Sequence, residues 1–189
     1  GTVMVKDIQT GANSSSPGAL TAVNGLLYFA ANDGINGNEL WKSDGTEAGT
    51  VLVKDINTAG GSNPDRITVV NNHIFFTATD AAANNSLWKS DGTNAGTIQL
   101  PVDAVVNTSP SFLINAGGTV FFRATVSAAI GQELCKSDGT VQGTVLVKDI
   151  YTGTTTSNIT PMTALGSNVI FGANDADVNI EPRISNGTA

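Results

Sequence analysis

The chain has 189 residues, of which 40% are hydrophobic and 13% are charged, and its formal net charge is -7. It has nine basic residues against sixteen acidic ones and no apolar run near the roughly 18 residues of a membrane helix, so neither nucleic-acid binding nor membrane insertion is predicted. A single histidine and a single cysteine exclude a zinc cluster made only of Cys and His side chains, and also a disulfide within the chain.

A short motif recurs along the chain at an almost constant interval. Ser-Asp-Gly-Thr begins at residues 43, 90 and 137, and Ser-Asn-Gly-Thr begins at residue 185. This interval of 47 or 48 residues is typical of proteins built from repeated supersecondary units. The sequence therefore predicts one repeat domain over residues 1–189. Its units are residues 9–56, 57–103, 104–150, and 151–189 together with 1–8.

The first complete unit has the pattern of four short strands. Asn24-Gly25 is a strong hairpin signal between the first two, an Asn/Gly-rich segment at 32–38 follows the second, and a turn at 44–49 follows the third. No stretch of ten residues has a helical period. The expected strands are residues 19–23, 26–31, 40–43 and 50–56.

The second strand of each unit is apolar on both faces. Leu-Tyr-Phe-Ala-Ala at 27–31 is followed by Ile-Phe-Phe at 74–76, Val-Phe-Phe at 120–122 and Val-Ile-Phe at 169–171. A strand that is apolar on both faces must be covered on both faces, which a radial array of small sheets achieves. The sequence predicts an all-β, β-propeller-like array of four four-stranded antiparallel blades. An elongated stack of small sheets is the alternative.

The two ends of the chain are complementary in sequence. Residues 1–8 match 49–56 and 143–150, which are fourth strands, while residues 181–185 have the pattern of a third strand. We expect residues 2–8 to pair with residues 181–185 and complete the last blade, because open sheet edges are a hazard that proteins avoid. In the alternative, residues 2–8 complete the last blade of a neighbouring subunit by strand addition.

The third strand and its turn carry a resemblance to a known family. Residues 38–50, Asn-Glu-Leu-Trp-Lys-Ser-Asp-Gly-Thr-Glu-Ala-Gly-Thr, resemble the ELWxxDGTxxGT repeat of large bacterial secreted and cell-surface proteins. Ser86 replaces the glutamate in the second unit, Cys135 replaces the tryptophan in the third, and the fourth unit is the weakest match. The resemblance covers the whole chain. It implies a β-propeller fold and an extracellular or cell-surface location, and it implies no catalytic activity.

Several residues that recur in the turns and third strands are candidates for ligand binding. The aspartates of the Ser-Asp-Gly-Thr motif form a ring of carboxylates in one reading, but an aspartate there more often accepts hydrogen bonds from its own turn. The tryptophans could stack on sugars, and the alternative is packing between blades. Lysines precede Asp7, Asp55 and Asp149 on the fourth strands, and further lysines recur at 42, 89 and 136 on the third strands, which suggests cross-strand Lys–Asp pairs. The ligand candidates are Trp41, Trp88, Asp44, Asp91 and Asp138.

Two loops offer the oxygen donors that calcium prefers. Residues 32–39 and 174–181 are rich in Asn and Asp, and hard cations bind six to eight such oxygens. The alternative is a solvated Asn/Asp/Gly turn. No other cofactor is predicted. The candidate calcium ligands are Asn32, Asp33, Asn36, Glu39, Asp175 and Asp177.

The motifs favour a non-enzymatic function. His73 is the only imidazole, and the acidic residues follow the repeat, whereas a catalytic pair should break it. The leading hypothesis is an extracellular structural or adhesive module that contacts other protein subunits or cell-surface components and that can self-assemble. The alternative is a carbohydrate-binding propeller, with glycans as ligands and calcium as an assisting ion.

Overall fold

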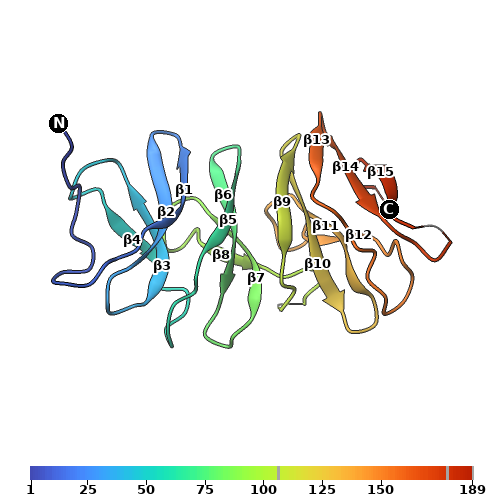
Figure 1. Cartoon of the computed structure of the whole chain (residues 1–189), viewed down its shortest axis with the longest axis horizontal. Coiled ribbons are helices and arrows are strands. Elements are labelled where there is room, and N and C mark those ends of the chain that lie inside the picture. The colour runs from blue at the N-terminus through green and yellow to red at the C-terminus, as the bar shows by residue number, and fades with distance from the viewer. Residues whose placement is uncertain (106, 178, 189) are drawn as a thin grey trace. The chain divides into compact units, whose positions relative to one another are not determined.

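The computed structural model of the chain describes residues 1–105, 107–177 and 179–188, and β-strands are its only regular elements (Figure 1). No helix long and apolar enough to cross a membrane occurs in the described residues. Fifteen strands form four antiparallel sheets, each following the order of the chain. The prediction of an all-β fold made of four repeated sheets is confirmed.

Three sheets have four strands and one has three. The first holds β1 (Gly18–Val23), β2 (Leu26–Asn32), β3 (Asn38–Ser43) and β4 (Val51–Lys54). The second holds β5 (Asp65–Val70), β6 (His73–Thr79), β7 (Asn85–Ser90) and β8 (Ile98–Leu100). The third holds β9 (Ser111–Ala116), β10 (Thr119–Ser127), β11 (Gly131–Ser137) and β12 (Val145–Lys148). The fourth holds β13 (Thr163–Leu165), β14 (Asn168–Ala173) and β15 (Glu181–Ser185).

The chain divides into two compact units. The first comprises Gly1–Asn84 and Trp88–Ile98, and the second comprises Asn85–Leu87 and Gln99–Ala189. The core of the first unit joins its two sheets, and that of the second unit joins the third and fourth sheets. The first core contains Tyr28, Leu40, Val53, Ile56, Ile74, Phe76, Ala78 and Trp88. The second contains Phe121, Leu134, Val147, Val169, Phe171 and Ala173, among others.

The second strand of the first three sheets is buried on both faces, as its sequence predicts. In the fourth sheet the prediction is wrong for one face, because Ile170 on β14 is 38% exposed. The phenylalanine at the repeated position is at most 5% exposed in all four sheets: Phe29, Phe76, Phe122 and Phe171. Because consecutive residues of a strand point to opposite faces, burial of Tyr28 beside Phe29 requires cover on both sides of the first sheet. The same reasoning applies to Phe121 and Phe122 in the third sheet.

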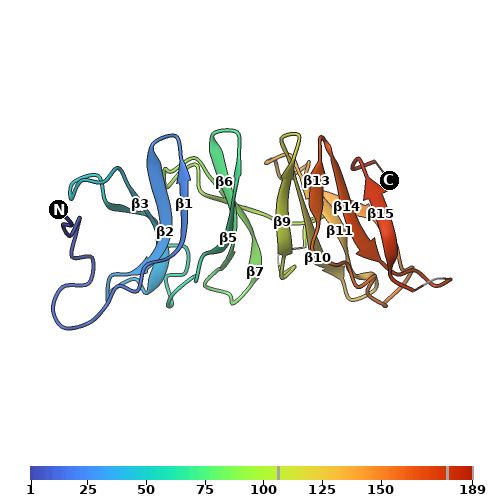
Figure 2. The same ribbon diagram turned by 45° about the horizontal axis from the view of Figure 1, so that its top comes forward.

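The N-terminal segment does not complete the fourth sheet of its own chain. Residues 1–7 are drawn without an arrow in Figure 2, and β15 pairs with β14 alone in the part of the chain that the structure describes. The predicted pairing of residues 2–8 with 181–185 within one chain is therefore not formed. The physical reason is a competing site on the first sheet, where the Lys6 ammonium donates to Thr50 O at 2.9 Å and Ile8 packs against Phe29 and Trp41. Pairing with a neighbouring subunit stays a prediction.

Candidate functional site

The repeated Ser-Asp-Gly-Thr turns are held by their own side chains. Asp44 Oδ1 accepts hydrogen bonds from the Thr46 amide at 2.9 Å and from the Thr46 hydroxyl at 2.7 Å, and Gly45 has a φ of 89° that favours glycine. These hydrogen bonds, the hydroxyl first, lower the pKa of Asp44. Asp91 and Asp138 bind Thr93 and Thr140 in the same way. These aspartates thus accept hydrogen bonds from their own turns, as one of the two interpretations predicts. A ligand role for them stays a prediction.

The two tryptophans pack inside the first unit. Trp41 and Trp88 are each 7% exposed. Trp88 Nε1 donates to Ala78 O at 3.2 Å, and Trp41 packs with Phe29 and Ala31. Neither ring presents an open face for stacking on a sugar, so the structure places both residues in the packing role.

The first calcium candidate is a self-contained turn. Asp33 Oδ1 accepts from the amides of Ile35 and Asn36 at 2.9 and 2.7 Å, Asp33 Oδ2 accepts from the Asn36 side chain, and Asn32 Oδ1 accepts from Gly34 N. Burial acts to raise the pKa of Asp33, but these hydrogen bonds outweigh it and the pKa lies below its usual value. Glu39, the fourth candidate in this loop, accepts from a different segment of backbone.

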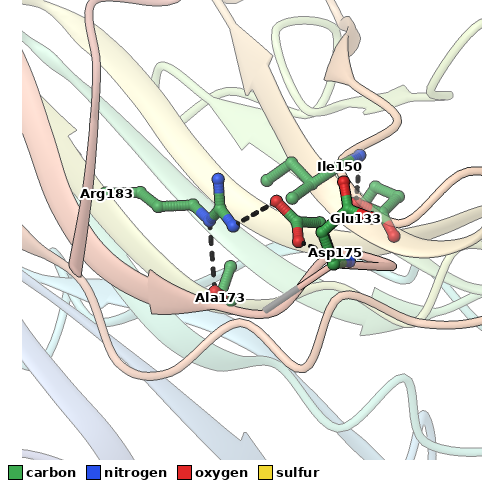
Figure 3. A network of polar contacts seen from close by, with 6 residues as sticks. Glu133, Ile150, Ala173, Asp175 and Arg183 are labelled. Atoms are coloured by element: carbon green, nitrogen blue, oxygen red, sulfur yellow. Dashed lines mark hydrogen bonds and ion pairs between the residues drawn. The ribbon is translucent and has the colours of Figure 1, made fainter. Parts of the chain in front are cut away.

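The second calcium candidate is neutralised by an arginine. Asp175 Oδ2 lies 2.6 Å from Arg183 Nη2, and Asp175 Oδ1 accepts from Asp177 N at 3.0 Å (Figure 3). No group of three or more His, Cys, Asp or Glu side chains that could hold a metal ion occurs among the described residues. Calcium binding at either loop stays a prediction.

Two buried glutamates hold the loops between sheets, a role that the sequence analysis missed: it grouped Glu39 with the calcium ligands and did not single out Glu133. Glu39 is fully buried, and its carboxylate accepts from the amides of Ile56, Asn57 and Ser62 and from the Ser62 hydroxyl at 2.5 Å. Glu133, also fully buried, accepts from Ile150 N at 2.9 Å and Ser157 N at 3.0 Å. The sequence does place both glutamates at the same position of the third strand. A glutamate at a buried strand position needs hydrogen-bond donors nearby, so this position could have indicated their role.

Burial of these carboxylates makes stability depend on pH. Burial raises the pKa of Glu39 above its usual 4.5, although four hydrogen bonds oppose the change. Because the pKa is higher in the folded than in the unfolded chain, the contribution of Glu39 to stability is complete below pH 4.5 and is lost as the pH rises through the raised value. In Glu39→Gln, we expect the stability of the first unit to vary less with pH in this window. Urea midpoints measured from pH 4 to pH 8, relative to the unmodified chain, test this, and an unchanged slope would contradict it.

Within each unit, lysines of one repeat bind the turn of the following repeat. Lys54 Nζ donates to Asn94 O and Thr97 O at 3.3 and 3.1 Å, and Lys42 Nζ donates to Gly92 O at 2.9 Å. In the second unit, Lys136 Nζ donates to Gly187 O at 2.7 Å. Lys42 and Lys54 do not form the predicted Lys–Asp pairs, because both donate to backbone carbonyls instead.

The lysine contacts predict a modest stability effect. Lys54→Met keeps the aliphatic stem and removes the donor, so we expect the free energy of unfolding to fall by about 1 kcal/mol, discounted for the partial exposure of this side chain. Urea unfolding followed by circular dichroism measures the change. Lys148→Met is the matched control, because Lys148 is exposed, and we expect it to lie within about 0.5 kcal/mol of the unmodified chain. Equal losses in both variants would refute the contribution of the lysine contact.

A groove of ≈ 640 Å³ lies between the third and fourth sheets, inside the second unit. One side is formed by β12 and the residues after it, including Val147, Lys148 and Ile150. The other side is formed by β15 and its turn, including Arg183, Ser185 and Thr188. In the other sheets the corresponding turn continues into a fourth strand.

Arg183 breaks the repeat at this groove. It stands where the first two units have tryptophan, and its Nε donates to Ala173 O at 3.1 Å (Figure 3), as Trp88 Nε1 does to Ala78 O. Its guanidinium also binds Asp175, and the two side chains are 29% and 30% exposed. The groove therefore combines an aliphatic floor with one charged pair that has no counterpart in the other repeats.

One of the comparisons with solved structures, at a TM-score of 0.52, supports the fold. No protein-family model and no curated protein matches the chain. Puromycin hydrolase is similar in structure, with 15% identity, a TM-score of 0.52 and coverage of 89% of this chain and 26% of that one. A protein described as TolB from Agrobacterium tumefaciens has 10% identity, a TM-score of 0.47 and coverage of 87% and 59%. A family 117 glycoside hydrolase from Zobellia galactanivorans has 15% identity, a TM-score of 0.44 and coverage of 92% and 66%.

The chain thus spans less than two thirds of the length of each of these three structures. At such low identities the likeness concerns the fold and not the activity. The predicted propeller-like fold is confirmed.

Proposed function

We propose that the chain is a non-enzymatic extracellular module with a structural or adhesive role, which acts through its β-scaffold and through protein–protein contacts. One observation carries the proposal: the charged residues that recur in the repeat are bonded to backbone groups of the scaffold itself. Asp44, Glu39 and Lys54 represent the three kinds, binding respectively a turn, an inter-sheet loop and the next turn. Side chains engaged in this way stabilise repeats and do not form a reaction centre.

The resemblance to the ELWxxDGTxxGT repeat supports a bacterial secreted or cell-surface location. The low proportion of charged residues, 13%, agrees with a module that interacts through apolar and backbone contacts. Exposed aliphatic side chains on β13, β14 and β15 provide such a surface, among them Leu165, Ile170 and Ile184. Other protein subunits or cell-surface components are the proposed partners.

A carbohydrate-binding function is the second candidate, and the groove beside Arg183 favours it. Sugar-binding sites combine an apolar surface with a few polar groups that fix orientation. Phe171 and Val147 line this groove together with the Arg183–Asp175 pair. This site differs from the one expected from the tryptophans, which are buried in the other unit.

Three measurements on the purified chain test the proposed function. Beads that carry the chain should adhere to one another, and a glycan array with and without a chelator should give no specific signal. A panel of glycoside substrates should show no turnover. Specific glycan binding that is lost in Arg183→Ala, but retained in Arg66→Ala, would overturn the proposal in favour of the second candidate. Arg66 is the matched control because it belongs to an exposed ion pair in the first unit.

A further inference from the structure

We infer that the two compact units of this chain unfold in separate transitions, because the second sheet lacks the side chains that tie a sheet to the loop and the turn that follow it. The inference concerns the scaffold alone, so it does not depend on the proposed function. It rests on the ties found inside each unit and on the residues that replace them at positions 86, 101 and 108.

Inside each unit, a buried glutamate ties one sheet to the loop that follows it. Glu39 on β3 accepts from Ile56 N at 3.1 Å and from Ser62 N at 2.8 Å, so one carboxylate binds both ends of the loop between β4 and β5. Glu133 on β11 binds the two ends of the loop between β12 and β13 in the same way. In a repeat protein, the interfaces between neighbouring repeats determine which of them unfold together.

The second sheet has a serine at this position. Ser86 on β7 is the counterpart of Glu39 and is fully buried. Its hydroxyl oxygen accepts from Gln99 Nε2 at 3.0 Å, and this bond joins two strands of the same sheet. A hydroxyl oxygen accepts fewer hydrogen bonds than a carboxylate, and the serine side chain is shorter. Ser86 therefore cannot bind both ends of a loop as Glu39 does.

The loop after the second sheet retains a donor that has lost its acceptor. Thr108 has the repeat position of Ser62, and both carbonyls accept an amide from the end of the second strand of the following sheet. The Ser62 hydroxyl donates to Glu39 Oε2 at 2.5 Å. Thr108 is fully buried, but its Oγ1 has no hydrogen-bond partner in the part of the chain that the structure describes. An unpaired buried hydroxyl is destabilising, and here it marks the place of the absent carboxylate.

The lysine tie is also replaced in the second sheet. Lys54, at the end of β4, donates to Thr97 O of the following sheet at 3.1 Å. Pro101 stands at the same position after β8 and has no side-chain donor. The counterpart of Thr97 O is Thr144 O, which accepts from the Asp103 amide at 3.2 Å. A loop residue thus takes the place that a strand of the preceding sheet has in the first unit.

The apolar cores and the polar ties give the same division. One core is drawn from the first two sheets and the other from the last two. The boundary between the units crosses β7, because Asn85–Leu87 belong to the second unit and the strand from Trp88 onward belongs to the first. Ser86 therefore stands where a tie between sheet and loop would act on both units. Without that tie, we expect each core to be lost in its own cooperative step.

Hydrogen exchange followed by mass spectrometry reports on each unit separately. Peptides from β2 belong to the first unit, and peptides from β14 belong to the second. Their most protected amides exchange only when the unit that contains them opens. The exchange rate of these amides therefore measures how often that unit opens.

A substitution in one core should accelerate exchange in one unit only. We expect Phe76→Ala to accelerate exchange of the β2 peptides at least about tenfold, and to leave the β14 peptides within about twofold of the unmodified chain. Phe121→Ala, in the second core, is the matched variant and should have the opposite effect. If either variant accelerates exchange in both units to the same extent, the chain is one cooperative unit and the inference is overturned.

A further pair of variants tests the cause. Ser86→Glu supplies the missing carboxylate, which can accept from the Thr108 hydroxyl as Glu39 does from Ser62. In this background, Phe76→Ala should also accelerate the β14 peptides, by at least about threefold. Ser86→Gln is the matched control, since it has the same length with one acceptor oxygen fewer, and the β14 peptides should not respond in its background. Equal responses in the two backgrounds would overturn the role assigned to residue 86. If Ser86→Glu does not fold, the two core variants still decide whether the units unfold separately.

Discussion

Replacing Glu39 with alanine is expected to lower the free energy of unfolding of the first unit by about 3–5 kcal/mol. The carboxylate is fully buried and is the acceptor for three amides and one hydroxyl of the loop between β4 and β5. Each buried donor left without an acceptor costs about 1–3 kcal/mol, and water that enters the vacated space recovers part of the sum. The loop itself remains connected, so the loss is large without being complete.

Tryptophan emission during urea unfolding measures this change. The chain has two tryptophans, and both Trp41 and Trp88 belong to the first unit, so their emission follows that unit. Glu47→Ala is the control, because Glu47 lies in the same unit but is exposed, and it should change the free energy of unfolding by less than about 0.5 kcal/mol. A loss below about 1 kcal/mol in Glu39→Ala would show that the loop does not depend on this carboxylate.

The second large effect is expected for Phe76→Ala, with a loss of about 3–5 kcal/mol. Phe76 is fully buried in the core that joins the first two sheets, where Tyr28, Leu40 and Trp88 also pack. Removing the ring takes away its transfer free energy and leaves a cavity whose walls belong to two sheets. Because rigid sheets cannot close around the cavity as a loop could, most of the cavity cost should remain.

The same urea titration provides the test for the core. Leu20→Ala is the matched control, since Leu20 lies on β1 but is 61% exposed. We expect its free energy of unfolding to stay within about 0.5 kcal/mol of that of the unmodified chain. Similar losses in both variants would mean that the second strand is not the main source of packing between the two sheets.

Much of the fold could be predicted because the same pattern of strands and turns recurs in each repeat. Periodicity fixed the number of sheets, Asn24-Gly25 located a hairpin, and apolar residues on both sides of Phe29 and Phe76 indicated cover on both faces. The division into two compact units could not be predicted from the sequence. It depends on how neighbouring repeats pack, and the repeats have nearly the same sequence.

The polar contacts were harder to predict, because they join residues that lie far apart in the sequence. Glu39 was grouped with Asp33 in one loop, yet its partners lie seventeen to twenty-three residues away. Lys54 was expected to pair with a carboxylate, but it binds backbone oxygens about forty residues downstream. Arg183 resembled a decayed tryptophan position, and only the structure shows it beside Asp175. Repetition reveals which residues matter, whereas their partners depend on how successive sheets face each other.

Because Cys135 is buried, the rate at which its thiol is labelled measures how often the second unit opens locally. Its thiol is the only one in the chain and is fully buried on β11. Burial also raises the pKa of the thiol. In the folded chain a thiol reagent therefore cannot reach the sulfur, and the reactive thiolate is not formed. Labelling must therefore wait until β11 becomes accessible, and its rate reports how often that happens. Transient openings of this half of the molecule can thus be timed without introducing any foreign probe.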